Sequence, residues 1–365
     1  MSADPQLRER LERAAGFLQV DPAVELDRLH GAAHRRERGR RLRALAVAAV
    51  IGVLGIVVAW QLLPPGPAAV PAGIPGGRIA FLEVDGRRRV VVGLELEGGD
   101  VTALSDQDAS ALAAAWSPDG TRIATVVERP GPVYQVVVAN ADGTDPVTIV
   151  QEPGTGAVGP DIIDVAWSPD GAKIAYAGRV VEDGVARRTI LIEDADGTGA
   201  PQALEGHWES VSWSPDGERL LVSGFPGREA PFDLFTVRPD GSGLVRLTND
   251  GAALHRALWS PTGDRIVSFS GDGDYALDVY VMDADGANRR RLTSWEGLDM
   301  FPVWSPDGEW IAFASDRDAT PAQQASNRSG EGIFTGLSMY AMRADGSGLR
   351  EVLESDGALP VTWTS

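Results

Sequence analysis

Seven polar side chains each lie a few residues before a tryptophan in the sequence. They are the best candidates for catalytic or binding residues. Imidazole and carboxylate groups can bind metals or exchange protons, and a guanidinium binds anions. Two histidines in adjacent repeats match no recognised metal-ligand spacing, so we predict no metal, no cofactor and no catalytic residue. We expect a ligand-binding ring instead, formed by Asp161, Asp164, His207, Glu209, His255, Arg256 and Asp299.

The tryptophans belong to a repeated pentapeptide, WSPDG, with one altered copy, WSPTG, at residues 259–263. Successive copies are 51, 46, 46 and 45 residues apart. A period of this length indicates a repeat architecture whose units bury a core only by stacking on each other. The tryptophans are large enough to fill the wedges between units, so we assign them a packing role: Trp116, Trp167, Trp213, Trp259, Trp304 and, in a last partial copy, Trp363.

Each repeat predicts four strands. A β-rich run follows WSPDG, a second turn signal such as DADG comes about 20 residues on, and a short run such as VRLT ends the unit. Proline and glycine suit the bends, and Asp119, Asp170, Asp216 and Asp307 should bond nearby backbone N–H groups there. Four-stranded units of this length are typical of a β-propeller.

The two ends of the repeat region complete one blade. Residues 77–105 supply three strands without a tryptophan strand, and LPVTWTS at the end supplies the missing one. The fold class is therefore all-β, a six-bladed propeller over residues 77–365 whose terminal strand closes the first blade. In this arrangement the polar ring surrounds the channel on the face opposite the Asp-Gly turns.

The linked motifs WSPDG, IAF, YVMDADG and RLT resemble those of TolB-like six-bladed propellers with WD40-like (PD40) repeats. The resemblance covers about residues 77–365 and implies an extracytoplasmic scaffold that binds a protein or a small ligand. Some lyases of similar fold use histidines at the channel mouth to bind metal. A metal-dependent lyase using His207 and His255 is therefore a second alternative function.

A membrane helix is predicted before the propeller. Residues 44–63 are uncharged, long enough to cross a bilayer, and preceded by the basic stretch 35–43. We expect a single-pass anchor in the cell membrane, with residues 1–43 cytoplasmic, a Pro/Gly linker at 64–76 and the propeller outside. A signal peptide cleaved near residues 70–72 is the rival interpretation. The chain has no cysteine, which excludes disulfides and a lipoprotein anchor.

The part of the chain that follows this predicted anchor is strongly acidic. Residues 64–365 carry 45 acidic and 23 basic side chains, so we expect no nucleic-acid partner. The expected partner is another envelope protein or a small ligand at the propeller face. The sequence of residues 1–43 predicts two short amphipathic helices, which could bind a cytosolic protein. The first alternative function is therefore a transmembrane sensor or anti-sigma-like regulator whose cytosolic tail binds a partner.

The sixth repeat carries an insertion between residues 313 and 339. The insertion lengthens a connection on the same face as the polar ring. Long loops on a rigid scaffold often carry recognition. We therefore expect either a binding loop or a tolerated polar insertion. If this face binds a partner, deletion of residues 319–330 should abolish binding and leave thermal stability nearly intact.

Overall fold

The computed structural model describes residues 74–85, 88–106, 108–130, 133–153, 164–182, 185–227, 230, 232–249, 251–271, 276–329, 335–355 and 357–365. The chain divides into two units, 1–66 and 67–365, and every described residue belongs to the second. The predicted tail, membrane helix and most of the linker lie outside the described residues. Within the described part, no helix is long and apolar enough to cross a membrane.

Six antiparallel sheets of four strands each form the second unit, as the repeats predict. Blade 1 contains β24 (Leu359–Thr364), β1 (Arg78–Asp85), β2 (Arg88–Glu95) and β3 (Val101–Ala103); blade 2 contains β4 (Ser110–Trp116), β5 (Arg122–Arg129), β6 (Val133–Asn140) and β7 (Val147–Pro153); blade 3 contains β8 (Asp164–Trp167), β9 (Lys173–Glu182), β10 (Val185–Asp194) and β11 (Gln202–Ala203). Blade 4 contains β12 (His207–Trp213), β13 (Leu220–Phe225), β14 (Asp233–Val237) and β15 (Val245–Arg246); blade 5 contains β16 (His255–Trp259), β17 (Arg265–Gly271), β18 (Leu277–Asp283) and β19 (Arg290–Arg291); blade 6 contains β20 (Asp299–Trp304), β21 (Trp310–Ser315), β22 (Ser338–Arg343) and β23 (Arg350–Leu353).

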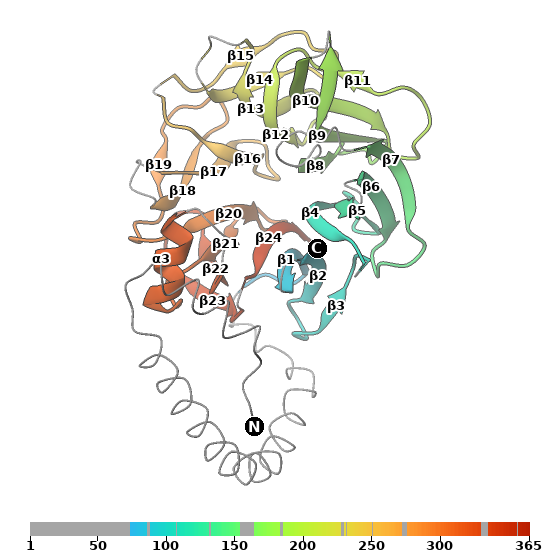
Figure 1. The fold of residues 1–365 in the computed structure, drawn as a ribbon. Helices are drawn as coiled ribbons and strands as arrows, with labels where there is room; N and C mark the ends of the chain where they lie inside the picture. The colour runs from blue at the N-terminus through green and yellow to red at the C-terminus, as the bar shows by residue number, and fades with distance from the viewer. Residues whose placement is uncertain are drawn as a thin grey trace, which may run out of the picture. The chain divides into compact units, whose positions relative to one another are not determined.

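The tryptophan-bearing strand of every blade is the innermost one. Strands β4, β8, β12, β16, β20 and β24 contact each other in sequence and close a ring, which surrounds the middle of the propeller in Figure 1. The C-terminal strand β24 pairs with β1 in blade 1, with Trp363 opposite Ile79. The predicted closure of the first blade by the terminal strand is confirmed.

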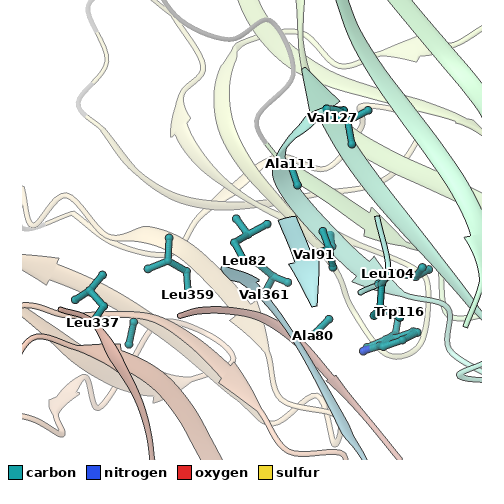
Figure 2. Close-up of a cluster of buried hydrophobic side chains, with 14 of the residues drawn as sticks. Ala80, Leu82, Val91, Leu104, Ala111, Trp116, Val127, Leu337, Leu359 and Val361 are labelled. Atoms are coloured by element: carbon teal, nitrogen blue, oxygen red, sulfur yellow. The ribbon is translucent and has the colours of Figure 1, made fainter. Parts of the chain in front are cut away.

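The hydrophobic core lies between blades. Each of six buried clusters joins residues of two or more blades, and each includes or packs against one repeat tryptophan. Figure 2 shows one of them, which includes Leu82 and Val91 of blade 1, Trp116 of blade 2 and Leu337 of blade 6. The tryptophans therefore fill the wedges between blades, because the facing sheets of neighbouring blades leave space that a large aromatic side chain can fill at close-packed density.

The WSPDG turns have the predicted chemistry. In the first copy, Ser117 Oγ and the backbone N–H of Thr121 both donate to Asp119 Oδ1, at 2.6 and 3.1 Å. Gly120 has a φ of 67°, which glycine adopts without strain. The altered copy WSPTG lacks the turn aspartate. Asp264, just after this turn, takes over as the acceptor, and Ser260 Oγ donates to its Oδ1 at 3.0 Å.

The insertion in blade 6 contains a helix, α3 (Pro321–Ser329), where we expected a loop. The Asn327 side chain is 6% exposed and bonds both the backbone N–H and C=O of Thr335, and Gln324 Nε2 donates to Asp316 O at 3.0 Å. Deleting residues 319–330 would remove these partly buried bonds, so we now expect the deletion to lower the stability.

Candidate functional site in the central channel

A cavity of about 390 Å³ opens inside the ring of inner strands. Five of the six inner strands end at a WSPDG or WSPTG turn, so the starts of these strands lie on the opposite face, as predicted for the polar ring. Four of the seven predicted residues line this cavity, namely Asp164, Glu209, His255 and Arg256. A second cavity of about 270 Å³ continues toward the tryptophans, and Asp164 and Arg256 line both.

β-bulges direct side chains into the channel. The pairing of the inner strand with its neighbour slips by one residue in blades 1, 2, 4, 5 and 6. A bulge redirects a side chain that regular pairing would place elsewhere. In blade 5 the slip includes Arg256, with φ of 45°, and in blade 6 it includes Phe301, with φ of 55°. Left-handed conformations at two bulky residues are unfavourable and often accompany function.

Arg256 is the cation of the channel. Its Nη2 donates to the backbone oxygen of Val361 at 3.3 Å, and its guanidinium lies 5.4 Å from the Phe301 ring centre. Its Nε is buried and has no hydrogen-bond partner among the described residues. An unpaired buried N–H is costly, and an anionic ligand would satisfy it.

Asp164 lies across the same cavity and is 7% exposed. Its Oδ2 accepts a hydrogen bond from the Val211 N–H of the next blade at 3.0 Å. Burial raises the pKa of Asp164 and lowers that of Arg256, and each charge partly offsets the shift of the other. Their charges are thus coupled, although no nitrogen–oxygen contact of ion-pair length joins these two described residues.

The two histidines have different places. His255 lies in the cavity between the rings of Phe232 and Phe269, at 5.2 and 5.8 Å, and burial lowers its pKa although Glu209 opposes the shift. His207 stacks on Phe225 at 4.6 Å and does not line the cavity. Burial lowers the pKa of His207 too, so both rings favour the neutral form.

The last two predicted residues do not join this group. Asp299 is fully buried and accepts a bidentate pair of bonds from Arg317 Nη2 at 2.9 and 3.0 Å, so it is a structural ion pair rather than a rim ligand. Asp161 lies outside the described residues. Across the described chain, no three His, Asp or Glu side chains converge as a metal site would require.

Sequence reasoning missed the apolar half of the cavity. Its walls include Leu112, Phe269, Leu277, Met300 and Phe301. Leu112 and Phe301 precede their repeat tryptophans by about the same distance as Arg256 does, so alignment of the repeats could have found them. The cavity therefore combines an apolar wall of five residues with six polar or charged ones, so it can accept a ligand that carries both apolar and polar groups.

No family model matches the chain. It is 34% identical over 160 residues to the uncharacterized protein Atu1656 of Agrobacterium fabrum, covering 40% of this chain and 52% of that protein. It is 35% identical over 105 residues to the TolB homolog of Chlorobium chlorochromatii, covering 28% of this chain and 22% of that protein. The chain thus spans about half or less of the curated relatives it matches.

Solved structures extend the likeness over the whole propeller. TolB from Acinetobacter baumannii matches with a TM-score of 0.61 and 19% identity, over 80% of this chain and 68% of that one. The chain has a TolB-like propeller fold. A putative TolB from Agrobacterium tumefaciens matches with a TM-score of 0.56 and 20% identity, over 78% of this chain and 92% of that one. At these identities the TolB-like likeness establishes the fold alone.

Proposed function

We propose that this TolB-like propeller is a binding scaffold of the cell envelope and that its ligand or partner enters the central channel. The observation that carries the proposal is the buried, unpaired Nε of Arg256 in a cavity with an apolar wall. An acidic group would bond Arg256 while an apolar group packs on Phe269 and Phe301. The ligand class is therefore an amphipathic carboxylate, either a small molecule or a side chain of an envelope protein.

We further propose that residues 44–63 anchor the propeller outside the membrane and that the site binds rather than catalyses. The hydropathy of 44–63 and the basic stretch before it support the anchor. A neutral His255 between two aromatic rings supports binding, because neither a nucleophile nor an orienting carboxylate is bonded to it in the described part of the chain. The sensor with a cytosolic tail stays as the alternative, since 1–43 carries the predicted amphipathic helices.

Photocrosslinking in the host cells tests this function. A benzoylphenylalanine at Leu277, which lines the cavity, should form a discrete adduct, whereas the same group at the exposed Val245 on the outer strand should not. Arg256→Gln should reduce the Leu277 adduct about tenfold, the loss expected for one charge-assisted contact. Equal adducts at both positions, or an adduct unaffected by Arg256→Gln in a folded variant, would contradict the proposal.

A further inference from the structure

Arginine side chains clamp neighbouring blades together on the face of the Asp-Gly turns. At three of the gaps, an arginine at the start of one blade's second strand lies over the repeat tryptophan of the next blade and donates to a glycine oxygen of that blade's turn. The guanidinium carbons lie 4.9, 4.6 and 5.0 Å from the ring centres. The donor distances are 3.2, 3.3 and 2.9 Å. The clamps are Arg78 with Trp116 and Gly120, Arg122 with Trp167 and Gly171, and Arg265 with Trp304 and Gly308.

The gap between blades 3 and 4 has a different residue at this place. Lys173, the single lysine of the chain, stands where the clamps have arginine. Its Nζ is bonded to Asp194 Oδ1 at 2.7 Å, within its own blade. A lysine also lacks the planar fork of donors that covers an indole and reaches a carbonyl together. Trp213 and Gly217 therefore have no clamp from Lys173.

A pocket of about 500 Å³ opens at this gap, and Lys173, Trp213 and Gly217 line it. Pro169 lies close to Gly217 on one side, with its Cδ 3.7 Å from the position a Cβ would take there. Pro239 also lines the pocket, and its oxygen accepts a hydrogen bond from Gln202 Nε2 at 2.9 Å. The pocket is thus a slot with an indole and a turn glycine in the positions that hold a guanidinium elsewhere.

The charge of the slot favours a cation. Asp170 and Asp216 line it. The hydrogen bonds from Ser168 to Asp170 and from Ser214 to Asp216 are the main reason that the pKa of each carboxyl lies below its usual range. Both are therefore ionised at neutral pH, in a domain that is strongly acidic. Phosphate groups of lipids or nucleic acids would be repelled.

We propose that the Lys173 slot receives an arginine side chain from a basic protein partner. The incoming guanidinium would stack on Trp213, donate to the Gly217 oxygen and pair with Asp170 or Asp216, in the way that Arg122 binds one gap earlier. The slot lies on the face of the Asp-Gly turns, opposite the mouth of the channel cavity. The inference is therefore independent of the proposed channel function, and either can fail alone.

Saturation-transfer NMR on the full-length chain tests the slot, with N-acetyl-arginine amide as the probe and N-acetyl-lysine amide as its comparison. We expect arginine to bind with a Kd in the millimolar range and about tenfold more tightly than lysine. Lys173→Arg should fill the slot with the chain's own guanidinium, weakening the probe about tenfold and raising the Tm. Reductive ¹³C-methylation of Lys173 supplies a local signal, which arginine should shift while the N-terminal amine stays unmoved.

Two variants serve as controls. Lys173→Gln cannot close a clamp and should bind arginine within about threefold of the wild type. Arg219→Lys changes the corresponding position of the next gap and should leave binding unaltered. Failure of arginine to bind at about 10 mM, no preference over lysine, or full binding by Lys173→Arg would each overturn the proposal.

Discussion

At the scale of single residues, the same side-chain types do different work according to their neighbours. Asp119 is an exposed turn aspartate whose pKa is lowered to about 2 by the Ser117 hydroxyl and the Thr121 N–H. Asp164 is a channel aspartate whose pKa is raised by burial. Asp299 is a buried partner of Arg317. The sequence assigned Asp119 to its turn, but only the surroundings separate Asp164, a candidate site residue, from Asp299, a member of an ion pair.

The turn aspartates give a pH prediction. Because the pKa of Asp119 is depressed by folding, its contribution to stability is present above the unfolded pKa of about 4 and is lost as the pH falls toward 2. Asp119→Asn should lower the Tm by roughly 1–2 °C at pH 6, a small change because solvent screens an exposed carboxylate. The difference from wild type should vanish near pH 2. Thermal unfolding followed by circular dichroism across this range measures it, and a constant difference at every pH would refute the assignment.

At the scale of elements, the hydrophobic core joins neighbouring blades to one another. Each core cluster spans neighbouring blades, and the arginine clamps join turns that are more than 40 residues apart. The repeat spacing predicted the strands and their turns, because local turn chemistry recurs in every copy. It did not predict α3, since a polar insertion of that composition carries no strong apolar period.

Shortening one clamp should loosen one gap. Arg122→Lys removes the bond to Gly171 and the guanidinium over Trp167, so we expect a loss of about 1–2 kcal/mol in the free energy of unfolding. Chemical denaturation with urea measures the loss. Arg219→Lys is the matched control, because the Arg219 side chain is exposed and should cost nothing measurable. Equal losses in the two variants would argue against the clamp.

At the scale of the whole molecule, ring closure depends on the C-terminal strand. Strand β24 is the inner strand of blade 1 and contacts β4 and β20 on its two sides. Its loss would expose the edge of β1 and one wall of the channel. An unpaired edge favours aggregation.

Truncation after residue 357 tests the closure. The truncated chain should fail to give a monomeric folded peak in size-exclusion chromatography and should lose its cooperative thermal transition. Removing Ser365 alone leaves every pairing of β24 in place and serves as the control. A stable, monomeric truncated propeller would show that five complete blades and an open blade 1 suffice for folding.

The sequence alone determined the repeat, the number of blades, the shared first blade and the face that carries the Asp-Gly turns. These follow from local turn chemistry and from the WSPDG motif, which recurs at a nearly constant spacing. Tertiary structure decided which polar residues meet. Arg256 lies at a bulge and Asp164 in the regularly paired inner strand of blade 3, and the two converge because the ring geometry turns inner strands from different blades toward one axis. His207, by contrast, stacks beside the channel, and Asp299 is paired. The open slot at Lys173 was also invisible in the sequence, because a lysine in place of arginine acquires meaning only beside the tryptophan and glycine of the next blade.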